Sequence, residues 1–142
     1  LVIAGKVGWK HRAIFREIKR SQKSAKISYI GYVAEADKLA VIKLAKMLVY
    51  PSFYEGFGFQ PLEAMSVGTP VIASQVSALP EVTGGAALLV DPYRVDDLAE
   101  AVNLLSTNRI LREELISRGR EQVKGYSWTK AAGLVLAELN AL

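Results

Sequence analysis

The chain has 142 residues, of which 51% are hydrophobic and 23% are charged, and its formal net charge is +4. This length predicts one domain, residues 1–142, with a substantial core, and the composition is that of an ordinary globular protein. No apolar run approaches the ~18 residues of a membrane span; cysteine is absent, which excludes disulfides and thiolate chemistry, and a single histidine, His11, cannot form a metal cluster alone.

Short apolar runs rich in Val and Ile recur along the first two thirds of the chain. They show no alternation with polar residues, which is typical of parallel strands buried on both faces. The runs cover residues 1–5, 27–31, 47–51, 70–74 and 86–91.

Segments of helical period separate most of these runs, at residues 10–22 and 35–46, and a further helix is predicted to begin near Gln60. The repeated order of strand, helix and strand predicts an α/β fold with a doubly wound parallel sheet. The loops at residues 5–9, 31–35, 51–59 and 74–80 all follow predicted strands. In such sheets ligands bind at that carboxyl edge.

The last third of the chain is predicted to be helical. Apolar residues at helical spacing occupy residues 95–105, after a start signal at Asp91 and Pro92. A second helix covers about 109–124 and ends near Gly125, and Ser127 is the expected N-cap of a final helix. Basic residues cluster at 6–26, 38–46 and 109–130. This charge suits a phosphate-bearing ligand or an anionic membrane, but a solvated face is the favoured interpretation, because most of it falls on helices with acidic neighbours.

Residues 50–65 carry the strongest chemical signal in the sequence. A predicted strand ends at Pro51, a loop with Gly56 and Gly58 follows, and Pro61 stands in the first turn of the next helix. Free N–H groups and the positive helix dipole make such a start a phosphate cradle. Glycines let a ligand approach the backbone closely.

Two carboxylates, Glu55 and Glu63, flank this predicted cradle. Carboxylates repel phosphate but accept hydrogen bonds from hydroxyl groups, so the layout suits a ligand with phosphate in the middle and polyols at both ends. Plainer alternatives stay open here. Glu63 could serve the helix dipole or half of a capping box, Glu55 could be a solvated loop charge, and Phe57 and Phe59 could be core residues.

The segment and its flanking blocks resemble the C-terminal, donor-binding domain of family 4 retaining glycosyltransferases (glycosyl transferases group 1), over essentially the whole chain. The blocks are Tyr50-Pro-Ser-x-Tyr-Glu-Gly-Phe-Gly, Pro61-Leu-Glu-Ala-Met, Gly68-Thr-Pro-Val-Ile-Ala-Ser, Leu79-Pro-Glu and Ala87-Leu-Leu-Val-Asp-Pro. The resemblance implies a Rossmann-like domain, one half of a GT-B fold. The Leu79-Pro-Glu block is similar to that of mannosyl- and glucosyltransferases.

The resemblance also implies a role for each site residue. Glu55 is the expected catalytic residue, which binds hydroxyls of the transferred sugar, and Glu63 is expected to bind the ribose. Backbone groups around Phe59 and Gln60 would bind the distal phosphate, and the backbone of Val33 the nucleobase. The full expected donor site is Val33, Glu55, Gly56, Phe57, Gly58, Phe59, Gln60 and Glu63. The implied reaction transfers a hexose from a GDP- or UDP-sugar with retention, by a front-face route, without metal, cofactor or a protein base.

One departure from the family pattern concerns the start of the domain. Family members have an additional strand and helix ahead of this region, with an Arg and a Lys that neutralise the diphosphate, and Lys6 and Lys10 do not match them. In the usual order that strand lies between those at 1–5 and 47–51, so we expect a gap in the sheet. The acceptor-binding N-terminal domain is absent too, so we expect the isolated chain to be inactive.

The expected partners are a nucleotide sugar and, through the missing domain, a saccharide, lipid or small-molecule acceptor, with no nucleic acid. The expected location is cytoplasmic, and the missing domain is where family members dock on the inner face of a membrane. Two alternatives remain: a non-catalytic nucleotide-binding module and a sugar-nucleotide epimerase of the same fold. Both glutamates, Glu55 and Glu63, are present, which argues against a degenerate module.

Overall fold

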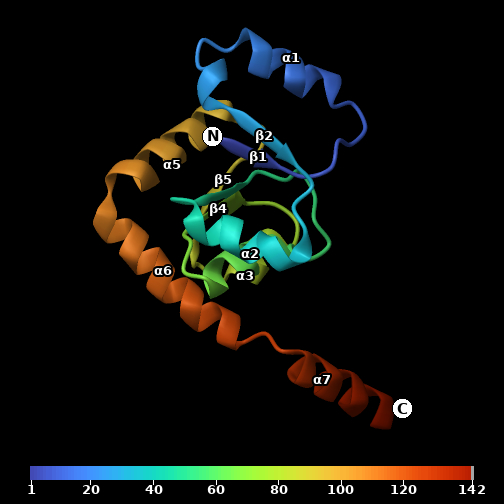
Figure 1. Ribbon diagram of the computed structural model, residues 1–142. Helices are drawn as coiled ribbons and strands as arrows, with labels where there is room; N and C mark the ends of the chain where they lie inside the picture. Colours follow the sequence, from blue (N-terminus) through green and yellow to red (C-terminus); the bar gives the residue numbers. More distant parts are fainter. Residues whose placement is uncertain (142) are drawn as a thin grey trace. The chain divides into compact units, whose positions relative to one another are not determined.

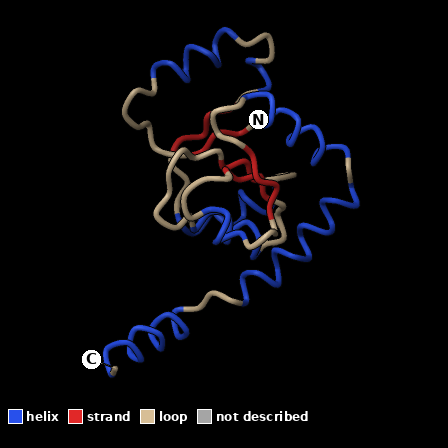
Figure 2. The backbone as a smooth tube through the Cα atoms, turned by 180° about the vertical axis from the view of Figure 1, so that it is seen from behind, coloured by secondary structure: helices blue, strands red, loops and turns tan. Residues whose placement is uncertain are grey.

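The computed structural model describes residues 1–141 and divides into two compact units, Leu1–Lys38 and the remainder of the chain from Leu39 (Figure 1). Strands and helices alternate through residues 2–107, and two more helices follow, to residue 140 (Figure 2). The fold is therefore α/β, as predicted. The boundary falls inside helix α2 (Glu35–Leu44).

The first unit contains two parallel strands, β1 (Val2–Ala4) and β2 (Ser28–Gly31). Helix α1 (Arg12–Arg20) and the short 3-10 helix η1 (Ser24–Lys26) connect them. The backbone N–H of Ser28 donates to Leu1 at 2.9 Å, and that of Gly5 donates to the carbonyl of Gly31 at 2.8 Å. These bonds extend the pairing beyond both ends of the strands.

No residue of the first unit is buried, which corrects the expectation that all strands would be covered on both faces. Val2 is 57% exposed and Ile30 is 45% exposed. Within these 38 residues only α1, η1 and the first turn of α2 are available to cover two strands, and such short helices bury too little apolar surface.

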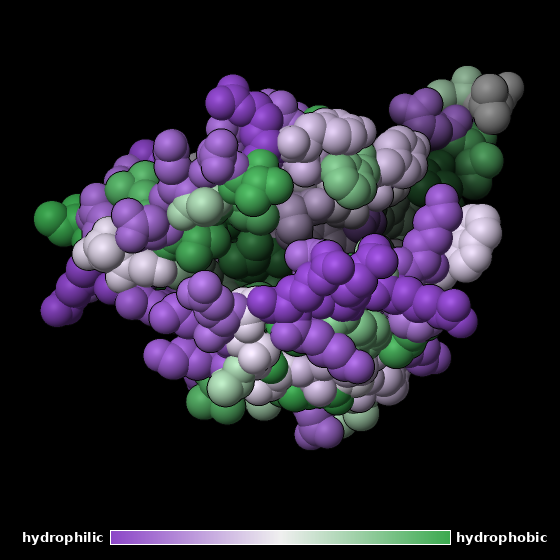
Figure 3. Space-filling view, turned by 90° about the horizontal axis from the view of Figure 1, so that it is seen from above, coloured by the Kyte–Doolittle hydropathy of each residue, from purple (hydrophilic) through white to green (hydrophobic). Residues whose placement is uncertain are grey.

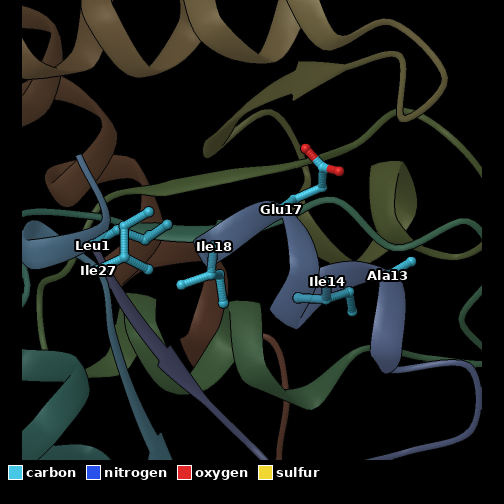
Figure 4. Close-up of a pocket in the computed structure, with 6 residues that line it drawn as sticks. All are labelled: Leu1, Ala13, Ile14, Glu17, Ile18 and Ile27. Atoms are coloured by element: carbon cyan, nitrogen blue, oxygen red, sulfur yellow. The ribbon is translucent and has the colours of Figure 1, made fainter. Parts of the chain in front are cut away.

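An apolar pocket lies between α1 and the strand ends of the first unit (Figure 4). Its lining residues are Leu1, Ala13, Ile14, Glu17, Ile18 and Ile27. In Figure 4 the carboxylate of Glu17 points away from the side chain of Ile18. A site for a charged sugar nucleotide needs several convergent polar groups, so this pocket is not a candidate.

The second unit is built on a three-stranded parallel sheet of order β3-β4-β5, formed by β3 (Leu48–Tyr50), β4 (Val71–Ser74) and β5 (Ala87–Val90). The central strand β4 is buried throughout. Tyr50 pairs with Ala73, and Ser74 pairs with Val90. The carboxyl ends of all three strands therefore lie at one edge.

Helices cover both faces of this sheet. Val71 and Ala73 face a core with helix α3 (Phe59–Ser66) and the short helix α4 (Leu79–Thr83), whereas Ile72 faces a core with α5 (Val95–Thr107). Because side chains alternate along a strand, these neighbours point to opposite faces. This is the predicted doubly wound arrangement.

The C-terminal helices begin and end close to the predicted residues. Helix α6 (Arg109–Lys124) is capped by Asn108, and α7 (Trp128–Asn140) by Ser127, whose hydroxyl accepts from the N–H of Lys130 at 3.1 Å. Asp91 makes a turn ahead of α5 instead of starting the helix directly. Helix α6 packs against α3, but α7 has no buried residue (Figure 1).

The strands form two separate sheets, β1-β2 and β3-β4-β5, so the predicted break between the strands at 1–5 and 47–51 is present. Helix α4 is an element that the sequence did not predict. Many large apolar side chains remain at the surface, where they form the green areas of the face in Figure 3. Among residues 1–141, none of the helices is long and apolar enough to cross a membrane.

Candidate functional site

The predicted cradle lies in the second unit, where residues 51–58 connect β3 to the start of α3. Helix α3 begins at Phe59, and no side chain caps it at Gly58. The first N–H groups of a helix have no partner within it, and here they are not covered by side-chain caps. Phe59 and Gln60 are exposed, so the helix starts at the surface of this chain.

The two loop glycines have different surroundings. Gly58 has φ +95°, and a Cβ at this position would lie 2.6 Å from Cδ2 of the buried Leu79. A Cβ on Gly56 would have no neighbour within 4 Å. Gly58 is therefore needed for the backbone turn and for packing against α4, while space beside Gly56 is open.

The aromatic side chains on either side of Gly58 also differ in how far they are buried. Phe57 packs against the core and against the ring of Phe59, with a centroid distance of 4.8 Å. Phe59 is 54% exposed. A ligand contact at Phe57 would therefore involve its backbone and not its ring.

Glu55 is held by several hydrogen bonds and is not a freely solvated loop charge. Its Oε1 accepts from the hydroxyl of Tyr50 at 2.6 Å and from that of Ser52 at 2.8 Å. Its backbone N–H donates to the hydroxyl of Ser77 at 3.0 Å. The carboxylate is partly buried, so these bonds fix its direction more firmly than they would in open solvent.

Tyr50 is hydrogen-bonded to Glu55 and lies within electrostatic range of Glu63. Burial, and then the hydrogen bond and charge of Glu55, raise the pKa of Tyr50 far above its usual value, and the charge of Glu63 adds to the effect. Both carboxylates therefore act on the same phenol. The hydroxyl of Tyr50 also lies 3.2 Å from Oε1 of Gln60, which joins the start of α3 to this group.

Glu63 is the fifth residue of α3, and one of its carboxylate oxygens is buried. A capping box would place this carboxylate at the third helical position, with a polar N-cap side chain. Here Pro61 is third and Gly58 is the N-cap, so the capping-box alternative is wrong.

Val33 belongs to the first unit, in the segment between β2 and α2. The second unit brings together the other seven predicted residues: Glu55, Gly56, Phe57, Gly58, Phe59, Gln60 and Glu63. Among residues 1–141 no group of three or more His, Cys, Asp or Glu side chains could hold a metal ion.

No role for Tyr50 or Ser77 was predicted from the sequence. Tyr50 ends β3 and Ser77 follows β4, and these strands are adjacent in the sheet. The predicted carboxyl edge of the sheet could have indicated both residues, because the loops that follow adjacent parallel strands are neighbours there. Tyr50 and Ser77 hold Glu55, so that a fixed carboxylate lies beside the uncapped N-terminus of α3. This arrangement can accept hydrogen bonds from a polyol and donate them to a phosphate.

A family model described as glycosyl transferases group 1 matches residues 1–122. The chain is 40% identical over 128 residues to O-antigen chain mannosyltransferase B of Escherichia coli, an alignment that covers 90% of this chain and 34% of the relative. The chain thus spans about a third of the length of that relative.

Two solved structures share this fold. Sucrose-phosphate synthase from Thermosynechococcus elongatus superposes with a TM-score of 0.87 at 27% identity, over 99% of this chain and 38% of that one. HepE of Anabaena, solved in complex with UDP, also gives 0.87, at 17% identity, over 99% of this chain and 40% of that one. The likeness to HepE extends to the fold alone.

Proposed function

The chain belongs to the glycosyl transferases group 1 family, and from this premise we propose that it is the donor-binding domain of a retaining glycosyltransferase. Its ligand is a nucleotide sugar, a GDP- or UDP-hexose. The observation that carries this proposal is the position of Glu55, held by Tyr50 and Ser52 beside the uncapped start of α3.

Each part of the ligand has a matching group in the proposed site. The N–H groups at Phe59 and Gln60 bind the distal phosphate, because the helix N-terminus is positive and carries unpaired donors. Glu55 accepts hydrogen bonds from the transferred sugar, and Glu63 from the ribose. The family resemblance assigns contact with the nucleobase to the backbone of Val33. In the second unit, the backbone at Gly56, Phe57 and Gly58 completes the loop around the diphosphate.

The proposed chemistry follows the family resemblance. The sugar is transferred with retention by a front-face route, and the donor phosphate accepts the proton of the acceptor, so no protein base is required. Glu55 then works by orienting the sugar at the reacting centre, where a fixed carboxylate costs no reorganisation during the reaction. Transfer without metal belongs to the same proposal, and full activity in the presence of EDTA would support it.

Residues 1–142 form one sugar-nucleotide-binding domain in this proposal. Because the E. coli relative is about three times as long as the matched region, residues outside this chain bind the acceptor, a saccharide, lipid or small molecule. The chain alone then binds nucleotide without transferring sugar. The relative is named as a mannosyltransferase, which makes GDP-mannose the first donor to test.

Calorimetric titration of the full-length protein with GDP and UDP, followed by transfer and donor-hydrolysis assays, tests the proposal. We expect one nucleotide to bind and its hexose derivative to be consumed. Binding without turnover would favour the non-catalytic module. Conversion of the donor to a different sugar without an acceptor would favour the epimerase.

A further inference from the structure

Three hydroxyl groups from two segments of the chain contact Glu55. We call Tyr50, Ser52 and Ser77 the hydroxyl clamp. Tyr50 ends β3, Ser52 lies in the following loop, and Ser77 lies between β4 and α4. Their contacts with Glu55 measure 2.6, 2.8 and 3.0 Å. The clamp thus joins two loops at the carboxyl edge of the sheet.

Both side-chain contacts of the clamp reach the same carboxylate oxygen. Oε1 of Glu55 accepts from Tyr50 and from Ser52. Among the described residues no hydrogen bond reaches Oε2. A carboxylate oxygen has two lone-pair sites, so Oε1 is saturated by the protein and Oε2 is the oxygen left for a ligand hydroxyl.

The backbone contact of the clamp depends on an unusual conformation. Ser77 has φ +55°, in the left-handed region that residues other than glycine rarely occupy. Its hydroxyl accepts from the N–H of Glu55, 22 residues away in sequence. Such conformations persist where the surrounding structure determines them, and they concentrate at functional sites.

Gln60 extends the clamp to the phosphate side of the proposed site. A phenol has one proton, and the 2.6 Å contact of Tyr50 to Glu55 uses it. The hydroxyl also lies 3.2 Å from Oε1 of Gln60, but its single proton is taken by the shorter contact with Glu55. The phenol of Tyr50 therefore lies beside both the carboxylate of Glu55 and the first turn of α3.

We propose that Tyr50 and Ser52 are positioning residues for glycosyl transfer: they hold Oε1 of Glu55 so that Oε2 accepts a hydroxyl of the donor sugar. Ser77 fixes the backbone from which this carboxylate extends. The inference rests on the proposed function. The raised pKa of Tyr50 supports it, because the phenol keeps its proton, and so stays a hydrogen-bond donor, well above neutral pH.

Tyr50→Phe in the full-length protein tests this role. A hydrogen bond to a charged group contributes enough that its loss should lower kcat about tenfold to hundredfold. The affinity and stoichiometry of GDP or UDP binding should stay within twofold, since neither ligand carries the sugar. Tyr126→Phe is the matched control, because its hydroxyl contacts only the carbonyl of Val82, at 3.4 Å, and its kcat should not change.

A second pair of variants separates positioning from packing. Ser52→Ala should lower kcat in the same direction, and Ser52→Thr, which retains a hydroxyl, should restore most of it. Unchanged kcat in both Tyr50→Phe and Ser52→Ala would overturn the inference. So would a parallel loss of kcat and nucleotide stoichiometry in both, because that pattern indicates misfolding and no specific effect on Glu55.

Glu55→Gln distinguishes this inference from the proposed function. If Glu55→Gln lowers kcat but neither Tyr50→Phe nor Ser52→Ala does, the proposed function stands and the positioning role fails. If the wild-type protein consumes neither a GDP- nor a UDP-hexose, or if Glu55→Gln is fully active, the proposed function itself fails.

Discussion

Glu55 and Glu63 carry the same charge but have different surroundings. Glu55 is fixed by hydroxyl groups from two loops, whereas Glu63 extends from the second turn of α3 with one oxygen buried. Two carboxylates held by different elements can contact different parts of one ligand. This difference separates the expected effects of substitution at the two sites.

Glu63→Ala should weaken nucleotide binding by the full-length protein. Loss of a charged acceptor for the ribose hydroxyls costs about 1.5–3 kcal/mol, which corresponds to about 10- to 150-fold in Kd. Calorimetric titration with GDP and UDP measures this directly. An affinity equal to that of the wild type would remove Glu63 from the site.

Tyr50 should make the folded chain sensitive to alkaline pH. The pKa of Tyr50 is raised in the folded state above the ~10 of an unfolded tyrosine. The folded state therefore holds this proton more tightly, so the contribution to stability is complete below about pH 10 and is lost as pH rises towards the folded-state pKa. Between pH 9 and 11 the wild type should lose more free energy of unfolding than Tyr50→Phe, as measured by urea denaturation. Parallel losses in the two proteins would contradict this linkage.

At the scale of elements, the start of α3 depends on close contact with α4. Gly58 supplies the left-handed turn ahead of α3, and its missing Cβ leaves room for Leu79, which is completely buried. The loop that forms the candidate site is therefore tied to the core behind it. This contact gives the site a rigid base.

Gly58→Ala should destabilise the chain by about 2 kcal/mol or more, because it adds left-handed strain to a clash with a buried side chain. Gly56→Ala is the matched control: Gly56 has no positive φ, and its Cβ would meet no atom within 4 Å. Its stability should change by less than about 0.5 kcal/mol. Urea denaturation of both variants measures the difference. Equal urea midpoints for the two variants would show that the side chain of Leu79 moves aside without a loss of stability.

At the scale of the whole molecule, burial divides unequally between the two units. No residue before Gly58 is buried, whereas all four residues of β4 are buried. The stability of the chain thus resides in the second unit, which also carries Glu55 and Glu63.

Hydrogen exchange of residues 1–142 should show this division. Amides of β1 and β2 open locally with little loss of apolar burial and should exchange fast, whereas those of β4 should require global unfolding. Mass spectrometry of peptides from the two regions provides the measurement. Equal protection in β2 and β4 would contradict the division.

Within residues 1–141, the sequence predicts the order and approximate bounds of five strands and of six of the seven α-helices, because buried parallel strands, helical spacing and capping residues such as Ser127 are local signals. It also supplied the family motif and the two glutamates. It did not reveal that β1 and β2 are exposed, nor the short helix α4, whose five residues are too few for a periodic pattern.

The surroundings of Glu55 depend on contacts between residues that are far apart in the sequence. Its contact with Ser77 spans 22 residues, and the role of Gly58 depends on Leu79, 21 positions further along the chain. These contacts arise because parallel strands bring distant loops to one edge of a sheet. The spacing of residues in the sequence does not predict which hydroxyl group contacts which carboxylate. The hydroxyl clamp could therefore be identified only from the structure.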